Sequence, residues 1–552
     1  MRRSTWPGVA AVALVAVIFA PVFHCDWVWD DTLLIVENDR IQGIDGILAG
    51  VTGGLWTDTP TFRQPAIYYR PVMRWSLVLD DALGLSPALA HLHSLLVHLA
   101  AVAGIFALGR RLSGQPQVAG LAAALYGLHP IQVEAVAWVS ARNDLQAAAA
   151  ALWAAWFMMG ASSKRVWPTV LGASMVAAAS KESAYLLPAA LLLLAWGWDR
   201  VSDVEVRRAL GASAVGVGSV VAGRLLAGIA WPPGADSSHL LASAPFTTAF
   251  ALEALIWPVS RVPGAHLAWP EPVAWTALLA GALGLLLLAG LGRRRALGAL
   301  GFGAVTALPA WVAVAHVGLF GDRYFVLPLA GVVLALASTV RGSSSKVGLL
   351  VGVLAAAGLT SQNLLTWRDN TTLWSTAAQA HDNPHTAGSY AKTLELAGDF
   401  NAAANWYARA TVAPHPLEHA CWNVAAIHFK RNRPTDAAAA GLRALDNGCP
   451  HSGELTCPTA YGMALTGRFN DAARLGALAD SDPWGLCRVV DLADAARSER
   501  WDALEGALES SSLDERSALA NKVGGLLKDG GDPETDSKVR KWAQSPAADS
   551  PL

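Results

Sequence analysis

The stretch RRSTWPGVAAVALVAVIFAPVFHCDWVWDD, residues 2–31, decides the fold class of this 552-residue chain. Its apolar run over residues 7–24 follows two arginines and is followed by two adjacent carboxylates, Asp30 and Asp31. An apolar run of this length can cross a bilayer. A cleavable signal peptide has a similar pattern, but no convincing small-x-small cleavage site precedes Asp26, so a retained membrane helix is predicted.

The composition also indicates a membrane protein. Hydrophobic residues make up 53% of the chain and charged residues only 15%, a balance that is unusual for a soluble protein. The 23 Trp outnumber the 13 Phe and the 8 Tyr, and many lie at the ends of apolar runs, where Trp rings settle at a membrane–water interface. The net charge of −2 leaves no basic surplus to neutralise phosphates, which excludes nucleic acid as a general partner.

Ten further apolar runs are candidates for membrane helices, so about eleven spans are predicted. The short run over residues 246–258 carries Glu253 and is interpreted as an interfacial or re-entrant piece. Several runs contain Pro or polar residues, so their predicted ends are approximate. The ten runs cover residues 88–108, 118–139, 145–159, 166–179, 184–198, 209–230, 273–291, 297–319, 324–340 and 347–365.

Basic residues fall in alternate loops between these runs, and short loops rich in Lys and Arg stay in the cytoplasm. With an odd number of spans, the N-terminus is cytoplasmic and everything after residue 365 lies outside the cytoplasm. The prediction is a multi-pass protein of the plasma (inner) membrane with a periplasmic or otherwise extracytoplasmic C-terminal part. The basic loops hold Arg2/Arg3, Arg110/Arg111, Lys164/Arg165, Arg200/Arg207/Arg208, Arg293/Arg294/Arg295 and Arg341/Lys346.

The chain becomes polar, Ala-rich and periodic after about Trp367. Three similar stretches, FNAAA, PTDAA and FNDAA, begin at Phe400, Pro434 and Phe469. Their spacing of about 34 residues resembles that of tetratricopeptide repeats, and an unrelated array of α-hairpins is the alternative. Small residues that let neighbouring helices approach closely are expected at Ala403, Ala437 and Ala472.

The predicted fold class is all-α: a polytopic membrane protein with about 11 transmembrane helices, followed by a soluble α-helical tetratricopeptide-like repeat domain. Residues 1–366 form the membrane domain, with the first non-cytoplasmic loop at 26–87. Residues 367–528 form the repeat domain. Residues 529–552 are polar and contain Pro, so a disordered tail is predicted there.

Four of the five cysteines lie in the repeat domain. An even number in a domain outside the cytoplasm predicts disulfides, and free buried thiols are the alternative. Three full pairings are possible, and the short loop between Cys449 and Cys457 favours that pair. No CxxC pair occurs, so a zinc site is not expected. The four residues are Cys421, Cys449, Cys457 and Cys487.

The acidic pair after the first run is the leading candidate for chemistry. Of two adjacent carboxylates, one can accept a proton from an attacking hydroxyl while the other orients it. Helix capping is the alternative role of Asp30 and Asp31, because Asp caps well. Trp27 and Trp29 beside them place the pair at the bilayer surface.

Further polar residues map to the same non-cytoplasmic face, and charged groups at membrane segments are functional candidates. An Arg guanidinium there can bind a phosphate through two hydrogen bonds. A metal site and a proton-coupled transporter use similar residues and stay as alternatives. These residues are Arg70, Arg74, His91, His98, His129, Glu134, Trp138, Arg142, Asp144, Lys181, Glu182, Asp322, Arg323 and Tyr324.

Seven motifs follow one another over nearly the whole chain: VWDDTLLIVEND, YYRPVMRWS, HLHSLLVH, HPIQVEAVAWVSARNDL, SKES, DRYFVLP and Trp367. Their order resembles that of the tetratricopeptide-repeat transmembrane O-mannosyltransferases and their bacterial relatives. Two positions depart from the family pattern. Ser94 stands where Asn is common, and Asp322 stands where Glu is usual. Neither change removes a needed chemical group.

The resemblance implies the fold of the C-type multispanning glycosyltransferases, which use a lipid-phosphate-linked sugar as donor. It implies that Asp30 or Asp31 is the general base or the acid that orients the acceptor, and that Arg70 contacts the donor phosphate. It also implies inversion at the sugar and no metal or other cofactor besides the lipid-phosphate sugar as co-substrate. Further candidates for donor or substrate binding are His91, His129, Glu134, Arg142, Lys181, Glu182, Arg323 and Tyr324.

We therefore expect a membrane glycosyltransferase that moves a sugar, mannose by resemblance, from polyprenyl phosphate to a protein Ser/Thr hydroxyl outside the cytoplasm. The repeat domain is expected to present the acceptor or to tether a partner. A lipid-linked glycan or a cell-envelope polymer is the alternative acceptor. A non-enzymatic membrane scaffold or a transporter is the alternative function. Membrane lipids are expected partners, and nucleic acid is not.

Overall fold

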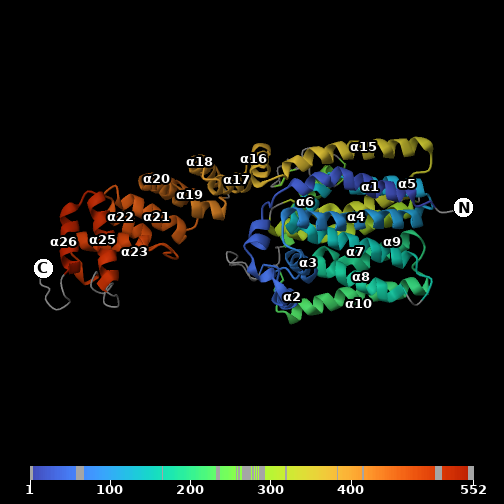
Figure 1. Cartoon of the computed structure of the whole chain (residues 1–552), viewed down its shortest axis with the longest axis horizontal. Coiled ribbons are helices and arrows are strands. Elements are labelled where there is room, and N and C mark those ends of the chain that lie inside the picture. The colour runs from blue at the N-terminus through green and yellow to red at the C-terminus, as the bar shows by residue number, and fades with distance from the viewer. Residues whose placement is uncertain are drawn as a thin grey trace. The chain divides into compact units, whose positions relative to one another are not determined.

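The computed structural model describes residues 4–56, 67–163, 166–231, 237–256, 293–317, 320–381, 383–412, 416–503 and 513–544, with a few positions between 258 and 284. Every regular element in these ranges is helical, and they contain no strand. The all-α prediction is therefore confirmed for the described residues. The chain divides into two compact units, Met1–Leu373 and Trp374–Leu552 (Figure 1).

Several helices of the first unit are long and apolar enough to cross a membrane. The predicted span over residues 273–291 lies largely outside the described residues, and the count of about eleven stays a prediction. The run over residues 246–258 belongs mostly to a longer helix, α11 (Ser237–Ile256). The described residues contain five candidate spans: Trp6–His24, Pro87–Ser113, Val204–Leu226, Asp322–Thr339 and Ser343–Thr366.

The predicted span over residues 118–139 is wrong, because the helix stops halfway. Helix α5 (Pro116–Gly127) ends at its last glycine, and α6 (Gln132–Ala137) follows a turn that contains Pro130. A proline disfavours helical geometry in the residue before it and has no N–H to donate. The break leaves Glu134 on a short separate helix instead of inside a continuous span.

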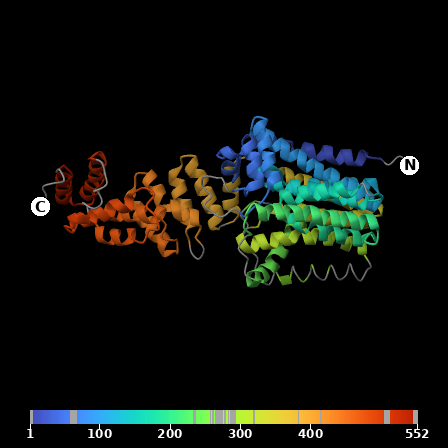
Figure 2. The same ribbon diagram turned by 90° about the horizontal axis from the view of Figure 1, so that it is seen from below.

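The helices of the first unit run side by side (Figures 1 and 2). A Cβ at Gly197 would lie 2.9 Å from the Gly298 Cα, and a Cβ at Gly331 would lie 2.8 Å from the Gly303 Cα. Glycines at such contacts let membrane helices pack closely. The helices are α1 (Trp6–Phe19), α3 (Pro71–Ala82), α4 (Pro87–Ser113), α7 (Arg142–Met159), α8 (Trp167–Ser180), α9 (Leu187–Gly197), α10 (Val204–Leu226), α13 (Arg294–Val317), α14 (Val326–Thr339) and α15 (Ser343–Thr366), besides α5 and α11.

The segment between α1 and α3 forms short irregular helices, including α2 (Gly43–Thr52). A π-helical turn, Thr32–Val36, directly follows the acidic pair, and such turns are frequent at functional sites. Leu34 on this turn is buried in one apolar cluster with Met73 of α3. Burial of these side chains holds the acidic segment against α3.

Helix α7 is fastened to α3 by a buried ion pair. The Arg142 guanidinium lies 2.6 Å from the Asp80 carboxylate, and both side chains are almost fully buried. Arg142 also donates hydrogen bonds to the Ser94 hydroxyl at 3.0 Å and to the Ala90 carbonyl at 2.8 Å, both on α4. Its donors are used within the bundle, so this residue joins three helices.

The second unit is an array of helical hairpins. Helices α18 (Phe400–Ala410), α20 (Pro434–Asp446) and α22 (Phe469–Gly476) begin at the residues that open the sequence repeats. The three alanines expected at close helix contacts, Ala403, Ala437 and Ala472, are fully buried. The tetratricopeptide class of the array stays a prediction. The other helices are α17 (Pro384–Leu396), α19 (Glu418–Lys430), α21 (Gly453–Ala464), α23 (Leu486–Arg497) and α25 (Leu513–Asp529), and α16 (Asn370–Ala380) spans the boundary.

The prediction of a disordered tail over residues 529–552 is wrong for its first part. Helix α26 (Pro533–Gln544) occupies this region, and its Val539 is fully buried against α25. Pro at the first helical position and acidic residues in the first turn both favour a helix start there. Residues 545–552 lie outside the described residues.

Two disulfides join helices of the second unit. Cys421 pairs with Cys449, and Cys457 pairs with Cys487, at Cα–Cα distances of 5.8 and 4.8 Å. The favoured pair of Cys449 with Cys457 is therefore wrong. Cys449 follows α20 and faces Cys421 on α19. Cys457 lies on α21 and faces Cys487 in the first turn of α23. Cys449 and Cys457 are therefore close in sequence but lie against different helices. The fifth cysteine, Cys25, is free and buried.

We expect each disulfide to stabilise the second unit by about 3–4 kcal/mol, because the bonded residues are 28 and 30 positions apart. Replacing both Cys421 and Cys449 with Ala should lower the unfolding temperature of this unit in the full chain. Replacing Cys25 with Ala is the control and should leave that temperature unchanged. Peptide mapping of the unreduced protein checks the pairing, and a peptide linking Cys449 to Cys457 would contradict it.

We expect Asp80→Asn to destabilise the first unit by about 3–5 kcal/mol, because it leaves the buried Arg142 cation without a counter-charge. Thermal unfolding of the detergent-purified full chain measures this loss. Asp81→Asn is the matched control, since Asp81 is half-buried and has no ion pair in the described part of the chain. Equal unfolding temperatures for the two variants would contradict the role of the pair.

Candidate functional site

Asp31 is fully buried and is bound by the segment that precedes α7. Its Oδ1 accepts hydrogen bonds from the Ser140 N–H at 2.8 Å and from the Ser140 hydroxyl at 2.6 Å. Its Oδ2 accepts from the N–H groups of Val28 at 3.2 Å and Val139 at 3.4 Å. Burial raises the pKa of Asp31 to about 6, and the Ser140 bonds limit this rise. With four donors in place, Asp31 anchors the loop.

Asp30 is half-buried, and its carboxylate accepts no hydrogen bond within the described part of the chain. Burial raises the pKa of Asp30 to about 7, the nearby Arg323 cation counteracts this rise, and the Asp31 charge adds to it. A carboxyl group with a pKa near neutrality exchanges protons readily at physiological pH. The structure therefore separates the two acids that the sequence alone left equivalent.

The backbone next to Asp30 has an unusual conformation. Trp29 has a φ of 56°, in the left-handed region that residues other than Gly rarely adopt. Its N–H donates to the Asn370 Oδ1 at 2.8 Å, and its ring stacks on Trp138 with ring centres 4.4 Å apart. Such strain persists where the surroundings impose it, and it is common at functional sites. Asn370, at the start of α16, therefore helps to set the direction of Asp30.

Arg323 is a cation within electrostatic range of Asp30. It forms an ion pair with Glu134 of α6, and Glu134 also accepts a hydrogen bond from the Asp322 N–H at 2.8 Å. The guanidinium carbon lies 4.8 Å from the centre of the Trp138 ring and 4.7 Å from that of the Tyr324 ring. Cation–π contacts of this kind hold the guanidinium against the aromatic rings.

A second buried ion pair joins Lys181, after α8, to Asp144 on α7. Burial lowers the pKa of Lys181 to about 8, and the Asp144 carboxylate limits this change. The Lys181 Nζ lies 5.1 Å from the centre of the Tyr324 ring. Because Arg323 contacts the same ring, Tyr324 joins the two ion pairs into one site.

Two arginines share the Glu182 carboxylate. Arg70 donates to Oε2 from Nε at 2.9 Å and from Nη2 at 2.7 Å. The Nη1 of Arg224 lies 3.8 Å from Oε1. This group carries one more positive than negative charge, and its Arg70 lies within electrostatic range of Lys181. A phosphate suits such a surplus, because guanidinium groups match its geometry.

Other predicted residues have structural contacts. Arg142 is fully used by α3 and α4, as described above. Arg74 donates to the carbonyls of Gly54 and Arg40, each at 3.2 Å. The fully buried His98 bonds to the Gly127 carbonyl at 2.9 Å, and His129 lies 3.3 Å from the Leu255 carbonyl. His91 on α4 is also fully buried. The residues linked to Asp30 through Arg323 thus form one cluster, whereas Arg142, Arg74, His98 and His129 contact other parts of the chain. The cluster consists of Glu134, Asp144, Lys181, Glu182, Arg70, Arg323 and Tyr324.

The sequence analysis missed four residues that shape the site: Asp80, Ser140, Arg224 and Asn370. A signal existed for Arg224, because a charge inside the predicted span over residues 209–230 is a functional candidate. Ser140 bonds to a residue 109 positions away and Asn370 to one 341 positions away. No pattern of neighbouring residues in the sequence predicts hydrogen bonds between residues so far apart.

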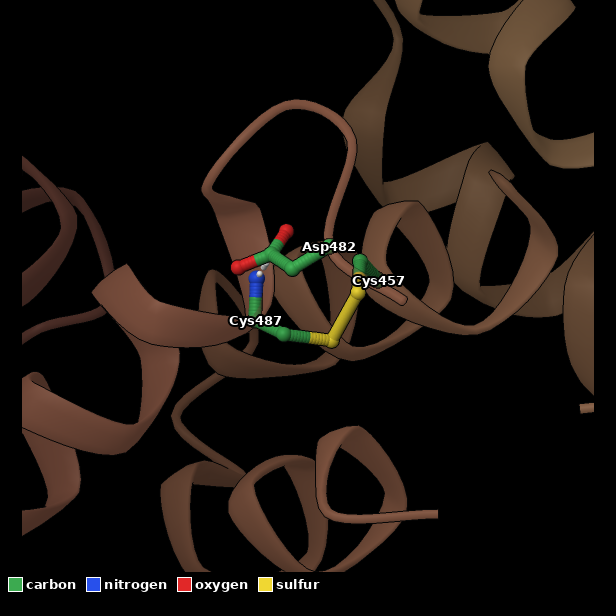
Figure 3. A group of neighbouring side chains, drawn as sticks. All are labelled: Cys457, Asp482 and Cys487. Carbon is green, nitrogen blue, oxygen red and sulfur yellow. Dashed lines mark hydrogen bonds between the residues drawn. A yellow bond between two sulfur atoms is a disulfide. The ribbon is translucent and has the colours of Figure 1, made fainter. Parts of the chain in front are cut away.

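One group in the second unit combines side chains that could ligate a metal: Cys457, Asp482 and Cys487 (Figure 3). The two sulfur atoms are bonded to each other in a disulfide. The Asp482 carboxylate accepts hydrogen bonds from the N–H groups of Cys487 at 3.3 Å and Arg488 at 2.9 Å. These contacts cap the first turn of α23, so the group has a structural role.

Comparison with known proteins gives a partial likeness. Over 139 residues, this chain is 27% identical to a curated Caenorhabditis elegans protein named a protein O-mannosyl-transferase. The match covers 24% of this chain and 20% of that relative, so the chain spans about a fifth of the relative's length. No family model and no solved structure matches the chain. The likeness suggests a glycosyltransferase, in agreement with the motifs and the apolar helices.

Proposed function

We propose that this protein is a membrane glycosyltransferase that moves a sugar, with mannose as the leading candidate, from a polyprenyl-phosphate donor to a protein Ser/Thr hydroxyl outside the cytoplasm. The observation that carries the proposal is the unbonded, half-buried Asp30 carboxylate beside Arg323, next to an Asp31 that four hydrogen bonds hold in place. The partial likeness to a protein O-mannosyl-transferase supports the choice of sugar and acceptor.

Asp30 acts as the general base in this proposal. The acceptor hydroxyl oxygen attacks the anomeric carbon while Asp30 accepts the hydroxyl proton. The bond between that carbon and the phosphate oxygen breaks, and the lipid phosphate leaves with the electron pair. Attack from the face opposite to the leaving group inverts the anomeric centre. The step needs a carboxylate near the nucleophile and cations near the leaving group.

The cations of the site suit the leaving phosphate. Arg70 and Arg224 share one carboxylate and so retain a surplus charge that a lipid monophosphate would neutralise. Lys181 and Arg323 both contact the Tyr324 ring, and each is balanced by an acid. A donor whose tail stays in the bilayer brings its sugar to the membrane surface, where Asp30 follows the end of the first apolar segment. The helical array of the second unit presents the protein acceptor in this proposal.

We expect Asp30→Asn to lower the transfer rate by about 10²–10⁴-fold without changing the unfolding temperature, because the amide cannot accept the proton. Asp31→Asn is the matched control and should lower the unfolding temperature, because the amide nitrogen cannot accept the two hydrogen bonds that one carboxylate oxygen of Asp31 accepts. Transfer from radiolabelled polyprenyl-phosphate mannose to protein in a membrane extract measures the rate. An active wild type with an equally active Asp30→Asn variant would contradict the role of Asp30. A wild type that transfers no sugar would contradict the proposed function.

We expect the transfer rate to rise with pH and to reach half of its maximum near pH 7, where Asp30 loses its proton. Its pKa is raised above the ordinary value, so below this pH the residue is protonated and cannot act as a base. The rate between about pH 5 and about pH 9 measures the profile. Thermal unfolding at each pH shows where the protein stays folded. A rate that falls with rising pH over the folded range would contradict Asp30 as the base.

A further inference from the structure

A groove of about 810 Å³ lies between α1, α5 and α15. Its mouth is at the start of all three helices, where Trp6, Gln115 and Lys346 line it. The acidic loop follows the other end of α1, so the groove is separate from the candidate active site. Along its length the lining is apolar and includes Leu14 and Val353.

The mouth of the groove is positively charged. Lys346 is its charged lining residue, and none of the described lining residues is acidic. The Lys346 Nζ donates a long hydrogen bond of 3.5 Å to the Gln117 side chain and has no ion pair in the described part of the chain. Three helices that begin here add the partial positive charges of their first N–H groups. The groove thus combines a cationic mouth with an apolar length.

The surroundings of the groove indicate lipid. Two of its three helices, α1 and α15, are candidate membrane spans. Large apolar side chains beside it are exposed, among them Val351 at 59% and Leu354 at 62% on α15 and Val9 at 58% on α1. In a membrane, such a surface faces acyl chains.

We propose that this groove binds one anionic phospholipid, with its phosphate at Lys346 and an acyl chain along the apolar lining between α1 and α15. A free phosphate would bind at the mouth alone and leave the apolar length uncovered. A helix from a second copy of the chain would cover the apolar lining but would leave the charge of Lys346 unpaired. The inference goes beyond the proposed function and does not depend on it.

Native mass spectrometry of the full chain tests the inference. The detergent-purified protein is incorporated into bilayers of equal parts phosphatidylglycerol and phosphatidylcholine, then released, and the retained lipid is counted. We expect one phosphatidylglycerol per chain. Lys346→Gln should lower the ratio of anionic to zwitterionic retained lipid by about fivefold, the effect of one cation near a lipid phosphate. Ala10→Phe, which fills the groove with a ring, should remove retained lipid of both kinds.

Arg207→Gln is the matched control, because Arg207 is also the fourth residue of an apolar helix, is exposed and is not among the residues that line this groove. It should leave the lipid ratio unchanged. If Arg207→Gln and Lys346→Gln lowered the ratio of anionic to zwitterionic retained lipid equally, the preference would come from general surface charge. This result would overturn the inference. Retention of no lipid, no preference for phosphatidylglycerol, or a dimer that dissociates on Ala10→Phe would also overturn it.

Discussion

Four hydrogen bonds to the buried Asp31 carboxylate determine the geometry of the candidate site. Three of them, from Val139 and Ser140, fasten the loop after α1 to the segment that leads into α7, and Ser140 is 109 positions from Asp31. An ionised carboxylate loses its hydration on burial, so it is stable only where donors replace the water. Because those donors converge on Asp31, its neighbour Asp30 is left exposed enough to react. Asp31 has a structural role, and the Asp30 carboxylate remains available to accept a proton.

Charge pairing explains the rest of the site. Each buried ion costs several kcal/mol of desolvation unless an opposite charge lies beside it. Lys181 with Asp144 and Arg323 with Glu134 meet this requirement, and every pair joins different elements of the bundle. The two arginines on Glu182 carry a surplus of positive charge, since they share one acid. This positive surplus is the feature that favours an anionic ligand.

Much of the helix organisation could be predicted from local patterns. Apolar runs indicate helices because every backbone group must be bonded internally in lipid, and the repeat units begin where Phe400, Pro434 and Phe469 recur. Two predictions from local patterns, the span over residues 118–139 and the disordered tail, were wrong because the backbone or the packing imposed another structure. Pro130 interrupts an apolar run that was long enough for a span. The polar segment after residue 529 forms a helix whose Val539 side chain is buried.

The sequence by itself predicted an all-α chain with apolar runs that suit membrane helices and a periodic C-terminal part, and it placed the candidate residues on one predicted membrane face. Only the tertiary structure decided what each residue does. It assigned Asp31 and Arg142 to the framework, left Asp30 open, brought in Arg224 and Asn370, and chose the disulfide partners. The physical reason is that apolar periodicity is a property of neighbouring residues, whereas hydrogen bonds and ion pairs are decided by which distant groups meet in space.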